Sequence, residues 1–259
     1  MENKLAFEDD FAPLQFAVGT SAGGEKIFRA CQTYMETRRD DSDRRVLVTL
    51  DCKNTFNSID RQAILDELGT KWPCFFDFFW QFYGTPAELW YRMEDGRTEI
   101  ILSQEGTQQG DAAGPFLFCL GLHLALVKLQ QEFPDDFVSA FMDDIDGGLD
   151  ETRVTGYVDR AEQLLAEKKS RLRRDKSAAW SPRWQQDSDI PADIAASGVK
   201  CSTDGITVLG CPLGGNSFIQ HSLEKITSGH QPLLDAIVTF AQKGLQGSGL
   251  LLRYYDPPG

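Results

Sequence analysis

Apolar residues recur along the chain at spacings that distinguish helices from strands. Within residues 24–38, Ile27, Cys31 and Tyr34 follow a helical period, which predicts a helix over this segment. Residues 44–51, RRVLVTLD, form a short β-branched run that ends in a carboxylate, as is typical of a buried strand. The first expected elements are therefore a helix and a buried strand.

Residues 58–83 predict two consecutive helices. The first, SIDRQAILDEL, begins at a cap supplied by Ser58 or Asp60 and presents an apolar face that includes Ile64. The second begins at Pro73, a residue suited to the first helical position, and reads PCFFDFFWQFY. Because this second helix is so rich in aromatic residues, we expect it to be buried.

Two β-hairpins are expected further along. The segments AELWYRM and TEIILS flank the turn EDGR within residues 87–103, and DFVSAFMDD and DGGLD flank a tight turn at Asp143 and Asp144. Between the hairpins lie a loop with three glycines, QEGTQQGDAAGP, and an apolar helix from Pro115 to about Gln131.

The remaining segments complete a mixed pattern. An amphipathic period predicts a helix over about 152–173, and SAAWSP and GITVLGCPLG predict short strands. Residues 181–200 are expected to form a connecting loop, and a helical segment follows residue 222. This order predicts an α+β fold, with an antiparallel sheet covered on one face by helices.

Composition narrows the class of protein. The 259 residues, 41% of them hydrophobic, suffice for one good-sized core or two modest ones. The longest apolar run, residues 114–127, is too short to span a bilayer and contains His123, which favours a buried helix. The start shows no signal-peptide pattern, and six cysteines form no CxxC pair. We therefore expect reduced cysteines and an intracellular protein of the nucleus or cytoplasm.

The net charge of −13 disfavours a nucleic-acid partner, because such proteins usually present a basic surface. Only two local basic patches stand against it, residues 38–45 and 167–176. On charge alone a nucleic-acid partner is therefore not expected, and other evidence has to support one.

Three aspartates suggest a metal site. Asp51 ends the first predicted buried strand, and Asp143 and Asp144 lie at the turn of the second hairpin. If these strands pair, the carboxylates repel one another, and two Mg²⁺ ions would relieve the repulsion and could drive phosphoryl transfer. The alternative is that the paired aspartates are solvated turn residues and that Asp51 caps the turn before the next helix.

Six segments of the chain, taken together, resemble one family. VLVTLDCKNTFNSI, QQGDAAGPFLF, FMDDIDGG and LGCPLG occur in the order of motifs A, B, C and E of reverse transcriptases, and they look most like those of non-LTR retrotransposons. QFAVGTSAGGE is similar to the end of the fingers in that family, and RRDKSAAW resembles motif D. The resemblance covers about residues 15–215 and is specific because six short motifs keep their order.

The resemblance implies a polymerase palm, with an antiparallel sheet backed by helices, partial fingers and a stub of thumb. Residues 1–43 would be a partial fingers segment, and residues 44–215 the palm, with a fingers insertion at about 60–105. Residues 216–259 would start a helical thumb. The first fingers motifs, a full thumb, an endonuclease domain and a Cys/His knuckle are not found, which suggests a fragment or a degenerate copy.

The resemblance also implies a set of catalytic carboxylates. The aspartates of motifs A and C fall on Asp51, Asp143 and Asp144, which would hold two Mg²⁺ ions, with Mn²⁺ able to replace them.

The nucleotide-binding residues implied by the resemblance are Phe56, Gln109, Gly110 and Lys176. The Phe56 ring would lie under the sugar and exclude a 2′-OH, Gln109 and Gly110 would contact the base pair, and Lys176 would approach the leaving pyrophosphate. Alternatives from the residues alone are a core role for Phe56, Gln108 in place of Gln109, and a solvated helix end at Lys176. Motif B also departs from the family, with DAAG where a proline usually stands.

The implied function is an RNA-directed DNA polymerase, a nucleotidyltransferase that extends a primer 3′-OH. Its partners would be an RNA template, a DNA primer and deoxynucleoside triphosphates, without a membrane. A truncated or co-opted inactive palm that binds nucleic acid or protein is the alternative favoured by the charge. A nucleotidyl cyclase, with a similar metal pair but no motif B loop, is a third candidate.

Overall fold

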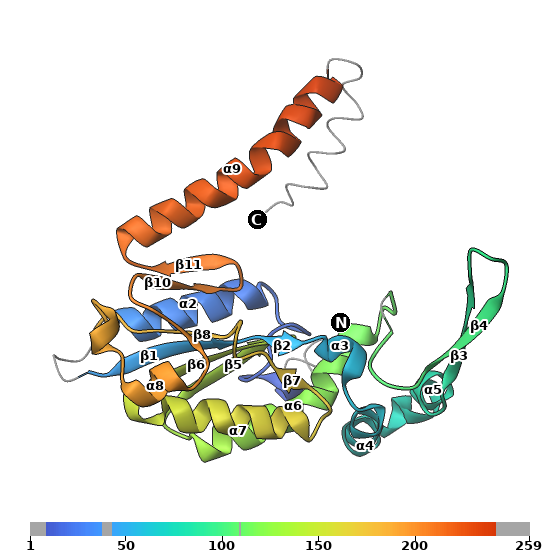
Figure 1. The fold of residues 1–259 in the computed structure, drawn as a ribbon. Coiled ribbons are helices and arrows are strands. Elements are labelled where there is room, and N and C mark those ends of the chain that lie inside the picture. The colour runs from blue at the N-terminus through green and yellow to red at the C-terminus, as the bar shows by residue number, and fades with distance from the viewer. Residues whose placement is uncertain (1–8, 38–42, 109, 242–259) are drawn as a thin grey trace.

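A five-stranded sheet forms the centre of the molecule in the computed structural model, which describes residues 9–37, 43–108 and 110–241 (Figure 1). In spatial order its strands are β5 (Phe137–Phe141), β6 (Asp144–Asp150), β1 (Arg45–Leu50), β8 (Ala178–Trp180) and β9 (Lys200–Ser202). Neighbouring strands pair antiparallel from β5 to β8, as the sequence predicted, and β9 adds to β8 in parallel.

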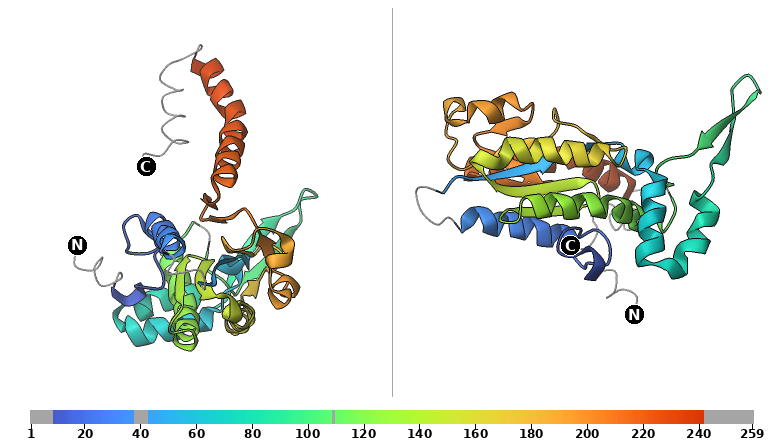
Figure 2. Two further views of the ribbon diagram at one scale, coloured as in Figure 1. Left: turned by 90° about the vertical axis from the view of Figure 1, so that its left-hand side faces the viewer. Right: turned by 90° about the horizontal axis from the view of Figure 1, so that it is seen from below.

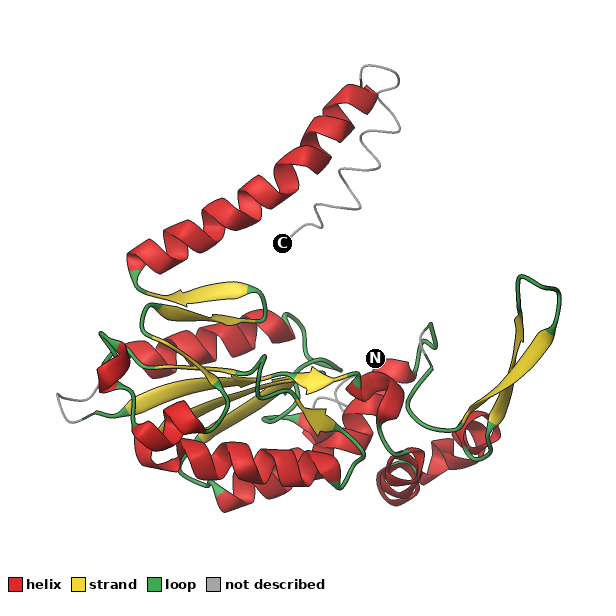
Figure 3. Cartoon of the chain, in the orientation of Figure 1, coloured by secondary structure: helices red, strands yellow, loops and turns green. Residues whose placement is uncertain are grey.

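Layers of helix cover both faces of this sheet (Figures 1 and 3). Alternation along β1 sends Val46 and Val48 into the core shared with α6 (Gly114–Glu132) and α7 (Val154–Ala166). Leu47 points the other way, into a smaller core with α2 (Gly23–Glu36) and the hairpin of β10 (Gly205–Val208) and β11 (Cys211–Gly214). Helices on one face were expected, and α2 on the second face is a correction, because its apolar stripe has its own partners there.

Two glycines let these layers approach the middle of the sheet closely. A Cβ atom on Gly147 would lie 2.8 Å from the Tyr157 ring of α7, and one on Gly148 would lie 2.7 Å from the Tyr34 ring of α2. An aromatic ring therefore packs against each face of β6, and at these two positions only glycine leaves room for the rings.

Two parts of the chain project from the body (Figures 1 and 2). One contains α4 (Arg61–Lys71), α5 (Pro73–Tyr83) and the hairpin of β3 (Ala87–Arg92) and β4 (Thr98–Ser103). The other is α9 (Asn216–Ala241), which leaves the β10–β11 hairpin and points away from the sheet. The two predicted hairpins, β3–β4 and β5–β6, are confirmed. Asp60 caps α4 as predicted, because its carboxylate accepts a hydrogen bond from the Gln62 N–H.

The expectation that α5 is buried was wrong. Phe79 and Tyr83 face the body and are buried, whereas Phe78, Trp80 and Phe82 are 57%, 44% and 52% exposed. The helix packs along one side only, so its aromatic residues divide between the core and the surface.

The predicted end of the helix at residue 173 was also wrong. Helix α7 ends at Ala166, and Lys169 adopts a φ of 59°, which a helix cannot continue. Residues Arg171–Leu172 instead form β7, which pairs with β2 (Cys52–Lys53). The expected loop over 181–200 contains a 3₁₀ turn at Asp187–Asp189 and a short helix, α8 (Ala192–Ala196). Two further short elements are α3 (Thr55–Ser58) and a 3₁₀ turn at Glu151–Arg153.

Cysteine burial agrees in part with the sequence reading. Cys31, Cys52 and Cys119 are buried and unbridged, whereas Cys74 and Cys211 are exposed. Among the helices that the structure describes, none is both long and apolar enough to cross a membrane.

Candidate active site

The three candidate aspartates lie at one edge of the sheet. Strands β1 and β6 are neighbours, and their register ends with Leu50 opposite Ile145. Continuing this register by one residue places Asp51 opposite Asp144, and Asp143 lies in the turn between β5 and β6. Asp144 begins β6, Asp51 directly follows the neighbouring strand β1, and Asp143 lies in the adjoining turn, so the three carboxylates share this edge.

A cleft of about 240 Å³ opens beside these residues. Asp51 and Asp144 line it together with Lys176, and Thr207 and Gly210 of the β10–β11 hairpin border it. The cleft therefore brings residues of motifs A, C and D, which are far apart in the chain, to one place.

The carboxylates at this edge repel one another. Desolvation raises the pKa of Asp143, and the nearby Asp51 raises it further. The pKa of Asp144 is raised by desolvation, then by Asp143 and then by Asp51. A cation placed among them would offset this repulsion.

The donor chemistry fits Mg²⁺. Among residues 9–37, 43–108 and 110–241, no three Asp, Glu, His or Cys side chains form a ready cage for a metal ion. Mg²⁺ does not require one, because it usually binds one or two carboxylates and takes its remaining ligands from water and substrate phosphates. Asp51 and the Asp143–Asp144 pair supply oxygen donors of this kind.

A buried glutamine holds the turn that carries Asp143. The Gln15 amide nitrogen donates to the Met142 carbonyl (3.0 Å), and the Gln15 Oε1 atom accepts from the Met142 N–H (2.9 Å). Met142 has a φ of 57°, which is unfavourable for a residue with a side chain. Gln15 therefore satisfies both backbone groups of a strained residue directly before Asp143. No local pattern predicts this contact, because the two residues are 127 positions apart in the chain.

Asp146 is a further carboxylate beside the cleft that sequence reasoning missed. It is 2% exposed, and the register places it between Thr49 on β1 and Ser139 on β5. Burial raises its pKa to about 7, with a smaller contribution from Asp144. Neither its Oδ2 atom nor Ser139 Oγ has a hydrogen-bond partner among the described residues. The signal was available, since the two-residue period of a strand puts Asp144 and Asp146 on one face.

Phe56 lies beside the motif B loop. It belongs to the short helix α3, is half-buried, and stacks at a tilt on Phe118, with 5.5 Å between ring centroids. The Thr107 N–H donates to the Phe56 carbonyl at 2.8 Å. Gly110 is exposed with a φ of 90°, which favours glycine, whereas Gln109 lies outside the described residues.

Two side chains that the sequence did not single out anchor this loop. Arg61 is buried and donates to the carbonyls of Ser103 and Gly106, each at 2.8 Å. The Tyr83 hydroxyl donates to the Asp111 carboxylate and accepts from the Gln108 N–H. The loop is thus fixed near both of its ends.

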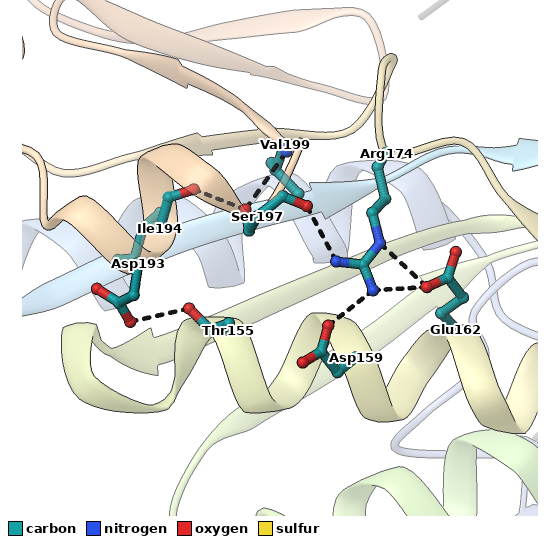
Figure 4. Close-up of polar contacts among 8 residues, drawn as sticks. All are labelled: Thr155, Asp159, Glu162, Arg174, Asp193, Ile194, Ser197 and Val199. Carbon is teal, nitrogen blue, oxygen red and sulfur yellow. Dashed lines mark hydrogen bonds and ion pairs between the residues drawn. The ribbon is translucent and has the colours of Figure 1, made fainter.

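Lys176 stands in a turn rather than at a helix end. It is exposed, and its N–H bonds the Arg173 carbonyl in the connection between β7 and β8. Arg174 ties this turn to the body (Figure 4), because its guanidinium reaches Glu162 (3.0 Å), Asp159 (2.7 Å) and the Ser197 carbonyl (2.9 Å). Helix α7 and the C-terminal end of α8 therefore hold the turn that presents Lys176 to the cleft.

A sheet with acidic residues at one edge and helices on both faces defines a polymerase-like palm. The chain belongs to the reverse transcriptase (RNA-dependent DNA polymerase) family, whose family model matches residues 10–213, well over half of its length.

A curated relative comes from a mobile element. The retrotransposable element SLACS 132 kDa protein of Trypanosoma brucei gambiense is 29% identical over 140 residues, which cover 53% of this chain and 11% of that protein. The chain therefore spans about a tenth of the length of the relative it matches.

Solved telomerases share the fold. Apo telomerase from Candida tropicalis has a TM-score of 0.53 and 10% sequence identity, covering 82% of this chain and 38% of that chain. Telomerase from Candida albicans, in a complex with a TWJ fragment of telomeric RNA, has a TM-score of 0.53 and 10% identity, covering 84% of this chain and 36% of that one. At this identity the likeness shows the fold alone.

Proposed function

We propose that the chain is the palm of an RNA-directed DNA polymerase that adds deoxynucleotides to a primer 3′-OH. The observation that carries the proposal is the placement of Asp51 opposite Asp144, with Asp143 in the adjoining turn, in a member of the reverse transcriptase family. In this scheme residues 44–215 are the palm, with a fingers insertion at about 60–105. Residues 1–43 belong to the fingers, and residues 216–259 begin the thumb.

Asp51 and Asp143 are the principal candidates to bind Mg²⁺ or Mn²⁺, with Asp144 as a weaker ligand. The ions would neutralise charge on the attacking and leaving oxygens of the phosphoryl transfer. The mutual repulsion of the carboxylates supports this role, because it makes the edge of the sheet receptive to a cation.

The residues around the cleft suggest how the chain positions a nucleotide. The Phe56 ring would pack against the sugar, where a 2′-OH would collide with it. Gln109 and Gly110 would contact the nascent base pair, and Lys176 would stabilise the charge on the leaving pyrophosphate. The placement of Lys176 in the same cleft as Asp51 supports the last assignment.

The substrates in this proposal are an RNA template, a DNA primer and deoxynucleoside triphosphates. Support for RNA comes from the family and from a structural neighbour, the Candida albicans telomerase, which was solved with a fragment of telomeric RNA.

Primer extension tests the proposal. Purified protein with Mg²⁺, a poly-A RNA template and an oligo-dT primer should extend the primer, and Asp143→Ala should lower the rate by about a thousandfold, or about 4 kcal/mol. Extension that survives in the variant would contradict the metal-binding role of Asp143.

A second candidate is a catalytically inactive binding module, and the net charge of −13 favours it. If the wild-type protein and Asp143→Ala both bind nucleic acid and neither extends the primer, this second candidate is favoured.

A further inference from the structure

A pair of like charges faces each other across the short β2–β7 ribbon. Lys53 and Arg171 are exposed and lie directly opposite in the antiparallel register. Like charges in this position destabilise a strand pair. Neither side chain forms an ion pair within the described part of the chain. Among the described residues, no ion pair offsets this repulsion between Lys53 and Arg171.

The two cations line a cavity of about 530 Å³. Lys169, which also bonds Asp60 at 3.0 Å, adds a third cation to the lining. Glu105 is the only carboxylate that lines the cavity among the described residues. A net positive cavity is unusual on a chain whose net charge is −13.

Neutral hydrogen-bonding groups complete the lining. Ser170 is 1% exposed, and its Oγ atom has no hydrogen-bond partner within the described residues. Asn54 and Ser58, at the two ends of α3, also line the cavity. Hydroxyl and amide donors beside cations are the groups that bind phosphate oxygens.

The cavity is joined to the catalytic edge through the backbone. Strand β2 follows Asp51 directly, and the Arg173 N–H, just beyond β7, donates to the Asp51 carbonyl at 2.7 Å. An anion held between Lys53 and Arg171 would thus bind to the same ribbon that fixes Asp51.

We propose that this cavity is a phosphate-binding site, with Lys53, Lys169 and Arg171 as its cations. A phosphate between Lys53 and Arg171 offsets their repulsion and gives Ser170 an acceptor. That the phosphates belong to the polymerase substrates rests on the proposed function. Two sources share the chemistry, the polyphosphate tail of a nucleoside triphosphate and the backbone of a nucleic-acid strand.

Binding in metal-free buffer with EDTA tests the site without requiring catalysis. The probes are inorganic tripolyphosphate and a single-stranded oligonucleotide that lacks terminal phosphates, each titrated by calorimetry. The test variant is K53Q/R171Q. The matched control is K200Q/K225Q, which removes the same charge from exposed lysines outside the cavity.

We expect K53Q/R171Q to weaken at least one probe by about tenfold or more, and the control to change neither by more than about twofold. Loss confined to tripolyphosphate identifies the nucleotide tail as the ligand, and loss confined to the oligonucleotide identifies the strand backbone. For the oligonucleotide, the slope of log affinity against log salt should also fall by about 1. Equal affinities in wild type and K53Q/R171Q, or no binding of either probe to wild type, overturn the proposal.

Thermal unfolding supplies a second readout. Without phosphate, K53Q/R171Q should unfold at the same temperature as wild type or a higher one, because the repulsion is removed. Tripolyphosphate should raise the Tm of wild type and of the charge-conserving K53R/R171K, but not that of K53Q/R171Q. If the protein binds phosphate at this site yet extends no primer, the polymerase proposal fails and the phosphate site stands.

Discussion

The side-chain amide of Gln15 pairs with both backbone groups of Met142, as a neighbouring strand would. The adjacent backbone continues the pairing, since the Phe16 N–H bonds the Ala140 carbonyl at 2.9 Å and the Ala140 N–H bonds the Leu14 carbonyl at 2.7 Å. A segment near residue 15 thus fixes the turn that places Asp143 at the edge of the sheet.

Replacing Gln15 by methionine should impair catalysis more than binding. The change keeps the volume of the side chain but leaves the N–H and C=O of Met142 without partners, which costs about 2 kcal/mol of stability. We expect the extension rate at saturating nucleotide to fall by about tenfold to a hundredfold, with KM nearly unchanged, because Asp143 is displaced. Steady-state kinetics and chemical denaturation measure the two effects.

Gln62→Met is the matched control for this change. Gln62 is exposed on α4, and its side-chain amide bonds the exposed Asp66 on the same helix, so its replacement should leave the extension rate and the stability close to wild type. A Gln15→Met protein with wild-type turnover would contradict the positioning role.

Removing one charge at the catalytic edge should stabilise the metal-free protein. The pKa values of Asp143 and Asp144 are raised, so their ionisation lowers stability as pH rises above the ordinary aspartate value of 3.8. Asp143→Asn should therefore melt a few degrees higher than wild type at pH 7 in EDTA, where about 1 kcal/mol shifts Tm by about 2–4 °C.

The difference in Tm between Asp143→Asn and wild type should become smaller under two conditions, and differential scanning calorimetry can measure it in each. Lowering the pH toward about 4 protonates the carboxylates of the wild type, and added Mg²⁺ neutralises them. If the wild type is as stable as Asp143→Asn at pH 7 without metal, the carboxylates do not repel one another as described.

Shortening Phe56 should relax the discrimination between sugars. Phe56→Ala removes the ring that would collide with a 2′-OH, so the preference for deoxynucleotides over ribonucleotides should fall by about tenfold or more. The ratio of kcat/KM for dTTP and UTP measures it. Phe56→Tyr keeps the ring and should keep the preference, and a preference that survives in Phe56→Ala would assign the residue to packing against Phe118 alone.

Releasing the turn that presents Lys176 should act on stability and turnover together. Arg174→Met removes the contacts with Glu162, Asp159 and the Ser197 carbonyl (Figure 4), at about 1–2 kcal/mol of stability for a partly exposed network. Primer extension should slow, though less than in Lys176→Met.

Arg29→Met serves as the control for Arg174→Met. Arg29 is exposed on α2, and its ion pair with Glu25 is long, at 3.9 Å. Unchanged stability in Arg174→Met would show that the network does not fix the turn.

Local patterns were enough to predict the elements that depend on local physics. Alternation and turn residues located both hairpins, and Asp60 signalled the start of α4. The order of short motifs predicted the family and the shared edge of Asp51 and Asp144.

What the sequence did not predict depends on tertiary partners. The exposure of Trp80 on α5 is set by which side of the helix meets the body, and the end of α7 is set by the pairing of Arg171 with Lys53. The bond between Gln15 and Met142 joins segments that no periodicity connects. Net charge also carries no information on where charges lie, because a value of −13 does not show that three cations line one cavity.

The glycines of β6 extend mutational sensitivity beyond the residues with functional groups. Gly147 and Gly148 touch the Tyr157 and Tyr34 rings from opposite faces, so a methyl group at either position pushes one helix layer away from the strand that begins at Asp144. A random-mutagenesis screen for lost extension should therefore recover alanine at these two positions alongside the aspartates. Such variants would lose activity because the helices no longer pack closely on β6, and not because a catalytic group is missing.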